Sequence, residues 1–226
     1  MYIKTTHSTS TLLKQLVAEG NPPDFIYAGY QTAGRGQTGN SWESEEGKNL
    51  LCSILLPPDK NLYFLNIAVG VALLRVIGEA FTIKWPNDIY YEDKKIAGIL
   101  IENAIIGNEI KYSIAGIGLN VNQTEFHSDA PNPISLKQIY GTEFAIDQLM
   151  NQVLEAVHKV LNEPEEEVWA YYKAHLYRRK GFWPFEDQNG TFEACIENVL
   201  PTGEIVLRDQ QGKERKYHFK QIRYIV

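Results

Sequence analysis

A glycine-rich segment with one arginine is the part of the chain best suited to bind an anion. Between Gln31 and Leu50 it reads Q-T-A-G-R-G-Q-T-G-N-S-W-E-S-E-E-G-K-N-L, with no apolar periodicity. Its glycines let backbone N–H groups approach a ligand closely, and Arg35 adds a fixed positive charge. A loop of this length without a helix or strand of its own is usually functional or disordered. The composition therefore predicts a loop that covers an anionic ligand, with a mobile surface loop as the alternative.

Two common phosphate-binding motifs do not describe this segment. Gly34, Gly36 and Gly39 match the spacing of the dinucleotide fingerprint, but that motif requires a helix to begin at the third glycine. Here Asn-Ser-Trp-Glu follows, and Asp59 falls in a Pro-Pro-Asp turn instead of at a strand end. The Walker A pattern GxxxxGK[ST] does not occur in the sequence. We therefore expect neither a Rossmann site nor a P-loop.

A second polar segment is framed by lysines. Lys84 ends one apolar run, Lys95 begins the next, and Asn87 and Asp88 lie between them. The lysines are either solvated strand ends or ligand contacts, and Asn87 and Asp88 either form a turn or face a ligand. Gly98 follows inside an apolar run, where a glycine weakens a strand unless another group approaches its backbone. This segment is therefore a second candidate for anion binding.

A third candidate lies at the end of the strand expected over residues 111–121. Gly116 and Gly118 leave one face of that strand open, and Asn120 follows within reach of a ligand. The histidines show no metal-ligand spacing, and no Ser-His-Asp or Cys-His nucleophile is evident. The residues therefore favour neutralisation of charge over nucleophilic catalysis.

The totals are those of an ordinary soluble protein. With 226 residues, 44% of them hydrophobic, the chain is long enough for one domain with a buried core and a small additional unit. Its net charge of −6 gives no basic footprint for nucleic acid, so an anion must be held by local charge. Cys52 and Cys195 lie far apart, which favours free thiols over a disulfide. No apolar run approaches the length of about 18 residues needed to span a membrane, and no signal core follows Met1, so we expect a cytoplasmic protein.

Helical and alternating periodicities predict an α+β chain. The clearest helix covers residues 142–162, where apolar residues follow the i, i+3, i+4, i+7 rule, and Pro164 starts another. Shorter helices are expected over residues 10–20 and 63–80. Strands are expected over residues 24–30, 50–56, 81–85, 96–102 and 111–121, with a polar turn between residues 85 and 96.

After residue 180 the pattern changes to short alternating runs. They cover residues 191–198, 204–208, 215–219 and 222–226, and turn signals such as Asn189-Gly190 separate them. We therefore expect a small all-β unit and place a boundary near Arg179. The predicted units are residues 1–179 and residues 180–226.

Together the three motifs resemble those of the biotin–protein ligases, the biotin–[acetyl-CoA-carboxylase] ligase family. In chain order they are Gly34-Arg-Gly-x-x-Gly with Trp42 and Gly47-Lys-Asn-Leu, then Lys84-Trp-Pro-Asn-Asp with Lys95-x-x-Gly98, then Gly116-x-Gly-x-Asn120. Each motif alone is unspecific, but the combination is highly specific and the resemblance extends over the whole chain. It implies a mixed central β-sheet flanked by helices, as in class II synthetase-like catalytic domains, followed by a small SH3-like β-barrel.

The resemblance also implies an activity. Members activate biotin with ATP to biotinyl-5′-AMP and transfer biotin to a lysine of a biotin carboxyl carrier protein, with Mg²⁺ as the metal. The protein would be a monomer or a homodimer. The catalytic residues would be Arg35, Lys84 and Lys95. Biotin would contact Ser8, Thr9, Ser10, Gln31, Arg35, Gly36, Lys95 and Gly98. ATP would contact Arg35, Gln37, Trp42, Lys84, Asn87 and Asn120, and Asp88 would face Mg²⁺.

Two other functions stay open at this stage. One is a lipoate ligase or octanoyltransferase, against which the Lys-Trp-Pro-Asn-Asp segment argues, and the other is a non-catalytic module that binds biotin or a nucleotide. The chain departs from the family at Gln37 and Thr38, where many relatives carry two arginines, which bears on how tightly the loop retains the adenylate. Because the motifs begin within about ten residues of Met1, we expect a form without the N-terminal DNA-binding domain of some relatives.

Overall fold

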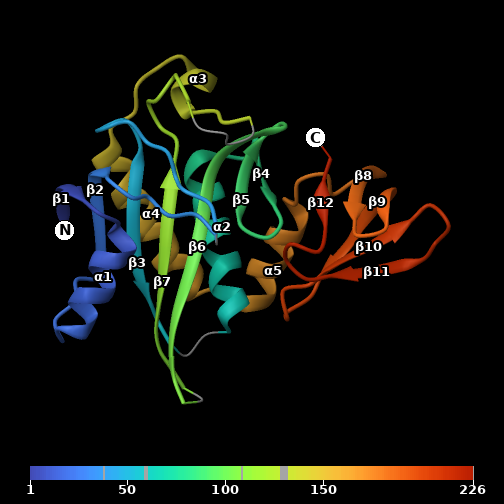
Figure 1. The fold of residues 1–226 in the computed structure, drawn as a ribbon, viewed down its shortest axis with the longest axis horizontal. Helices are drawn as coiled ribbons and strands as arrows, with labels where there is room; N and C mark the ends of the chain where they lie inside the picture. The colour runs from blue at the N-terminus through green and yellow to red at the C-terminus, as the bar shows by residue number, and fades with distance from the viewer. Residues whose placement is uncertain (38, 59–60, 108, 128–131, 226) are drawn as a thin grey trace.

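A seven-stranded mixed sheet forms the larger part of the molecule (Figure 1). The computed structural model describes residues 1–37, 39–58, 61–107, 109–127 and 132–225, so Thr38 and Asp59 lie outside the described residues. The strands of this sheet are β1 (Tyr2–Thr6), β2 (Phe25–Gln31), β3 (Leu50–Leu56), β4 (Phe81–Lys84), β5 (Asp88–Tyr91), β6 (Lys94–Ile106) and β7 (Glu109–Leu119). Their order is β1-β2-β3-β7-β6-β5-β4, and the one parallel pair is β1 with β2.

Helices cover both faces of this sheet. They are α1 (Thr9–Ala18), α2 (Leu62–Ile77), α3 (Leu136–Tyr140), α4 (Ile146–Leu161) and α5 (Glu165–Ala174). α1 lies alone on one face, where Leu13 packs with Ile26 and Ile114 in a small apolar cluster. α2 packs on the other face and is itself covered by α4 and α5. None of the described helices has both the length and the apolarity needed to span a bilayer.

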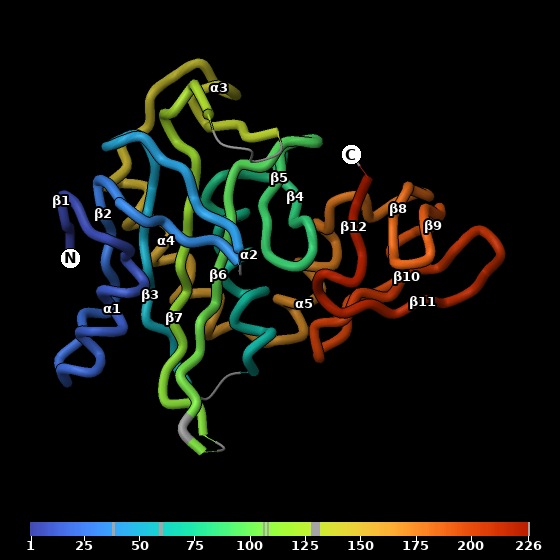
Figure 2. The backbone as a smooth tube through the Cα atoms, in the orientation of Figure 1, coloured from blue at the N-terminus to red at the C-terminus, as the bar shows by residue number. Residues whose placement is uncertain are grey.

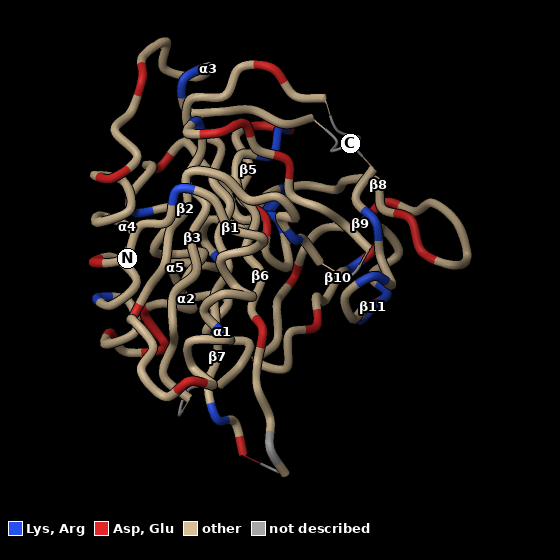
Figure 3. Tube along the Cα trace, turned by 60° about the vertical axis from the view of Figure 1, so that its left-hand side comes forward, with Lys and Arg blue, Asp and Glu red and all other residues tan. Residues whose placement is uncertain are grey.

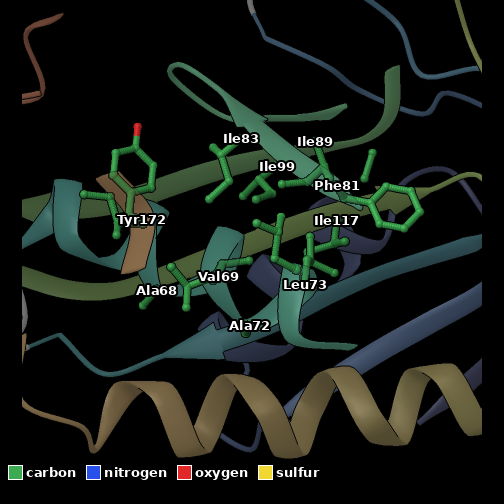
Figure 4. Packing of buried hydrophobic residues seen from close by; sticks show 14 of the residues in the cluster. Ala68, Val69, Ala72, Leu73, Phe81, Ile83, Ile89, Ile99, Ile117 and Tyr172 are labelled. Atoms are coloured by element: carbon green, nitrogen blue, oxygen red, sulfur yellow. The ribbon is translucent and has the colours of Figure 1, made fainter. Parts of the chain in front are cut away.

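The main core lies between α2 and the sheet (Figure 4). Val69 and Leu73 of α2 are fully buried against strand residues such as Ile83, Ile99 and Ile117. Because α2 lies between the sheet and two further helices, it is apolar around most of its circumference. The Asn61 side chain caps its first turn by accepting hydrogen bonds from the backbone N–H groups of Tyr63 and Phe64, 2.9 and 3.1 Å away.

A second, five-stranded antiparallel sheet follows in the C-terminal part and packs beside β4, β5 and α5 (Figure 1). Its strands are β8 (Trp183–Asp187), β9 (Gly190–Val199), β10 (Ile205–Asp209), β11 (Glu214–Tyr217) and β12 (Arg223–Tyr224), in the order β11-β10-β9-β8-β12. The Trp85 indole N–H donates a hydrogen bond of 3.0 Å to the carbonyl of Gly203. Arg178 donates one of 2.7 Å to the carbonyl of Ile225. The second sheet is therefore joined to the first by buried and charged contacts.

The predicted fold class is confirmed: a mixed central sheet flanked by helices, with a small C-terminal β unit that is consistent with an SH3-like barrel. Three strands were not predicted, namely β1, β5 and β8. The polar turn expected between residues 85 and 96 is wrong in part, because residues 88–91 form β5 between β4 and β6. Pro86 and Asn87 interrupt the apolar pattern there and obscure a strand that the neighbouring strands impose. The boundary near Arg179 stays a prediction.

Leu13→Ala tests how α1 is held on the sheet. Leu13 is fully buried in a small cluster, so its truncation should lower the free energy of unfolding by about 2–5 kcal/mol. Urea unfolding measures this change. Thr11→Ala, at an exposed position of the same helix, is the control and should stay within about 0.5 kcal/mol of the unchanged protein. Equal losses in the two variants would contradict the anchoring role of Leu13.

Candidate active site

One cavity of about 520 Å³ gathers nearly all the residues predicted for the site. It lies on the α1 face of the sheet, where the segment after β2 crosses β7 and β6 (Figure 2). The predicted residues that line it are Ser8, Thr9, Ser10, Gln31, Arg35, Gly36, Gln37, Trp42, Lys84, Asn87, Asp88, Lys95 and Gly98. Segments far apart in the sequence therefore meet around one space.

The end of the cavity at α1 is a small polar pocket. The Thr9 backbone N–H and hydroxyl both donate to the Gln31 side-chain oxygen, at 2.7 and 3.1 Å. Ser53 of β3 bonds to the Thr9 and Ser10 hydroxyls at 2.8 and 2.9 Å. Ser8 is the N-cap residue, but its side chain makes no capping hydrogen bond, so capping does not explain it. Ser53 was not predicted, although a serine inside the apolar run 50–56 was a signal for a polar contact.

Glycines line the middle of the cavity, where they expose the backbone of β6 and β7. Gly98 and Gly118 are paired across β6 and β7, and the Trp42 indole lies over both. A Cβ atom at Gly118 would lie 2.3 Å from the ring, and one at Gly98 would lie 3.1 Å from it. A Cβ atom at Gly116 would lie 2.8 Å from the Ser10 hydroxyl. These glycines therefore make room for side chains of the site, as their placement inside strands suggested.

Two lysines and a carboxylate form the cationic end. The Lys95 ammonium pairs with Asp88 at 2.7 Å and lies 5.7 Å from the centre of the Trp42 ring. The Lys84 ammonium donates to the Tyr90 hydroxyl at 2.9 Å and lies over the rings of Tyr90 and Tyr224. Burial lowers the pKa of Lys84; the negative charge of Asp88 opposes this shift, and the positive charge of Lys95 adds to it. The two predicted lysines thus line the same cavity.

Arg35 lies toward the other end of the cavity. Its guanidinium donates to Glu102 of β6 at 2.7 Å, and the second oxygen of Glu102 accepts from Lys14 of α1 at 2.6 Å. Gly98 and Glu102 are four residues apart on one strand, which corresponds to about 13 Å. Arg35, Lys84 and Lys95 therefore share a cavity, but the arginine does not meet the lysines at a single point in this state.

Asn87 and Asn120 have structural partners. The Asn87 amide donates to the carbonyl of Ile99, which fixes the turn before β5 to β6, although Asn87 also lines the cavity. Asn120 is buried and donates to the carbonyl of Ile134 at 3.1 Å. It is not among the described residues that line the cavity, so its contact with a nucleotide stays a prediction.

The C-terminal unit supplies a wall that sequence reasoning did not assign. Phe219, Lys220, Ile222, Arg223 and Tyr224 line the cavity opposite α1. Phe219 lies edge-on to Trp85, with ring centres 6.4 Å apart. The only local signal was the basic and aromatic character of residues 215–224, and nothing in it indicated which strand the segment would face.

The described lining of the cavity carries more cationic than anionic side chains, although the net charge of the protein is negative. Its described lining holds five cationic side chains, those of Arg35, Lys84, Lys95, Lys220 and Arg223, and a single carboxylate, that of Asp88. Elsewhere acidic and basic residues are interspersed along the chain (Figure 3). Among the described residues no group of three His, Cys, Asp or Glu side chains is placed to hold a metal. The lining therefore suits a polyanion.

Fold and cavity define an α+β protein with a cavity whose cationic end lies beyond a small polar pocket. Comparison with known proteins identifies its family. Residues 2–120, more than half of the chain, match the Biotin/lipoate A/B protein ligase family. The chain therefore belongs to this family, as its motifs predict.

Individual relatives agree with this assignment. The chain is 29% identical over 238 residues to the bifunctional ligase/repressor BirA of Bacillus spizizenii, covering 96% of this chain and 71% of the relative. It is 24% identical over 231 residues to the biotin–[acetyl-CoA-carboxylase] ligase of Paracoccus denitrificans, covering 92% and 94%. A solved structure of biotin protein ligase from Aquifex aeolicus in complex with biotin and ATP has a TM-score of 0.80 at 24% identity, covering 100% of this chain and 98% of that chain, and shows the same fold.

Gly118→Ala tests the contact between Trp42 and the sheet. The added methyl group would overlap the indole, so the ring must move, and overpacking of this kind costs about 1–3 kcal/mol. Thermal unfolding should show a lower Tm for Gly118→Ala. In the Trp42→Ala background the same substitution should cost much less, because the ring is gone. An equal cost in both backgrounds would show that the tryptophan is not what the glycine accommodates.

Proposed function

We propose that this chain is an ATP-dependent biotin–protein ligase, which activates biotin to biotinyl-5′-AMP and transfers biotin to a lysine of a biotin carboxyl carrier protein. The observation that carries the proposal is the continuity of one cavity from the polar pocket at α1 to the cationic side chains at β4, β6 and the C-terminal unit. Such a cavity fits a small polar ring system, a short tail that ends in a carboxylate, and a nucleotide triphosphate beyond it.

The polar pocket fits the ureido ring of biotin. Ser8, Thr9, Ser10 and Gln31 offer hydroxyl, amide and backbone groups around a space of small volume. Since Ser53 already bonds to two of these hydroxyls, the donors are oriented before a ligand enters. Trp42 and Gly98 would then border the tail, and Lys95 would meet the carboxylate.

The cationic end offsets the repulsion between the reacting groups. Each pair of unit negative charges about 4 Å apart repels by about 4 kcal/mol at an effective dielectric constant near 20. Lys84 and Lys95 can stabilise the charge that develops as the carboxylate approaches the α-phosphate. Lys220 and Arg223 add positive charge around the remaining phosphates. Gln37 carries no charge where many relatives have arginine, so the two C-terminal cations gain importance in this chain.

The reaction has two steps that the lining can serve. A biotin carboxylate oxygen attacks the α-phosphorus of ATP, and the bond to pyrophosphate breaks. The neutral amine of the carrier lysine then attacks the acyl carbon, and AMP leaves with the bonding electrons. Exclusion of water protects the mixed anhydride between the steps.

The residues that line the cavity could hold Mg²⁺ only together with the phosphates of a bound nucleotide. Asp88 is the one carboxylate in the described lining, and it is paired with Lys95. Mg²⁺ is commonly held by one or two carboxylates together with substrate phosphates and water. Asp88 would supply that carboxylate, and Mg²⁺ would neutralise phosphate charge when bound.

The carrier protein and the compartment are part of the proposal. A biotin carboxyl carrier domain would bring its lysine to the cavity, and the number of protein copies that act together, one or two, stays a prediction. Both cysteines are unpaired in the structure, as predicted, and this state supports a cytoplasmic protein.

Incubation with ATP, Mg²⁺, biotin and a carrier domain tests the proposal directly. Mass spectrometry should show one biotinyl group on the carrier only when all components are present. Modification with lipoate but not with biotin would support the lipoate ligase alternative. Binding of biotin or ATP without any product would support the non-catalytic alternative.

Lys95→Ala should abolish formation of the adenylate. Without the ammonium, the biotin carboxylate loses its counter-charge next to the phosphate, and biotin-dependent release of pyrophosphate should fall by a factor of 100 or more, equivalent to about 2.7 kcal/mol. Lys94→Ala removes the exposed neighbouring lysine and is the matched control. Near-normal pyrophosphate release from Lys95→Ala would refute the role of Lys95.

Arg223→Gln should weaken ATP binding selectively. Arg223 is a largely exposed cation at the cavity and also pairs with Glu186, so we expect the KM for ATP to rise by about 3- to 10-fold with little change in the KM for biotin. Lys216→Gln, an exposed cation of the same unit that does not line this cavity, is the control. An equal rise in both variants would indicate only a general electrostatic effect.

A further inference from the structure

Arg35 lies on the loop between β2 and β3, outside the named helices and strands. It lies between Gly34 and Gly36, where a bridge to Ser41 and a hydrogen bond of 3.0 Å from the Trp42 N–H to the Gly34 carbonyl hold the backbone of the loop. An arginine side chain has several rotatable bonds and loses much entropy when it is fixed. For Arg35 to meet an anion at a defined place, another group must therefore hold its guanidinium.

Glu102 is that group in the structure. One Arg35 nitrogen donates to Glu102 at 2.7 Å, and the Glu102 side chain is only 19% exposed. A guanidinium has five N–H donors, so this contact leaves donors for a ligand in the cavity that Arg35 lines. Glu102 is on the same strand as Gly98 and Leu100, which both line the cavity. The carboxylate therefore fixes Arg35 to a rigid strand beside the ligand space.

The Lys14 ammonium offsets the negative charge that Glu102 places beside the ligand space. An unneutralised Glu102 would repel an anionic ligand and would draw the guanidinium fully toward itself. The Lys14 ammonium occupies the other Glu102 oxygen at 2.6 Å. One negative charge is thus shared by two cations, and the cluster keeps a net positive charge toward the cavity.

We propose that Glu102, neutralised by Lys14, is a positioning residue that holds Arg35 for the acyl-adenylate reaction. This inference rests on the proposed ligase function, because Arg35 acts on the substrate and Glu102 acts only through Arg35. The ligand group concerned is the anionic part of the biotin and ATP substrates that comes within reach of the Arg35 guanidinium.

Glu102→Gln tests the inference by steady-state kinetics. The substitution keeps the volume and removes the charge, and we expect the KM for biotin to rise by about 3- to 10-fold, together with faster loss of biotinyl-5′-AMP from the protein. Glu102→Asp, which keeps the charge, should recover part of the affinity. Glu109→Gln removes a carboxylate from another ion pair on the same β-hairpin and is the control.

A double-mutant cycle separates positioning from a general structural effect. Arg35→Ala should raise the KM for biotin by an order of magnitude or more, and Glu102→Gln should then add less than a factor of two in that background. An equal effect of Glu102→Gln with and without Arg35 would overturn the inference. An unchanged or lower KM in the single variant would overturn it as well.

Limited trypsin digestion of the ligand-free protein tests the role of Glu102 independently of the proposed ligase activity. Trypsin cleaves after Arg35, and in the ligand-free protein Glu102→Gln should speed that cleavage several-fold relative to cleavage after Lys48, the internal reference. If the unchanged protein ligates no biotin, the proposed function fails, and the trypsin result alone decides whether Glu102 holds Arg35. If biotin is ligated and neither cleavage nor KM changes, only the role of Glu102 fails.

Discussion

The packing of Trp42 against the bare backbone of Gly98 and Gly118 is the contact on which the site depends. The two glycines are opposite each other on β6 and β7, so they leave a gap in the layer of side chains on this face. Because the indole fills the gap, the loop that carries it is fixed against the sheet. The Lys95 ammonium lies 5.7 Å from the centre of this ring, and Arg35 is carried by the same loop as the tryptophan. Gly98 and Gly118 therefore help to position the loop between β2 and β3, and with it the charged side chain of Arg35.

The two ends of the ligand space lie at different positions along β6. Lys95 and Asp88 lie by Gly98, whereas Glu102 and Arg35 lie four residues further along β6. The polar pocket at α1 borders the second end. A ligand in this space therefore meets hydrogen-bonding groups at its ring system and positive charge along its anionic part. The cavity favours a molecule with that order of groups, and biotin joined to a nucleotide has it.

Motifs that are local in sequence were predictable, and contacts between distant segments were not. The glycine-rich segment, the lysine-framed segment and the apolar periodicity of α2 and α4 are each visible within about twenty residues, and they led to the correct fold class and family. Glu102 escaped notice because a glutamate on a strand is ordinarily solvated, and its partner Arg35 is 67 positions away. Lys220 and Arg223 were missed because their position at the cavity depends on how the second sheet docks. The strand β5 was missed since its pairing partners, and not its own pattern, determine it.

That docking makes the C-terminal unit a part of the site. Lys84 and Trp85 are neighbours in the chain, and the Lys84 side chain lines the cavity. The Trp85 indole N–H donates a hydrogen bond to the carbonyl of Gly203, which follows β9 of the second sheet. Tyr224 of β12 packs over the Lys84 ammonium, and the burial that results lowers the pKa of that lysine. A desolvated cation interacts with an anion more strongly than a hydrated one does, because the local dielectric constant is lower. The docking of the two sheets therefore also contributes to the burial of a cation that lines the cavity.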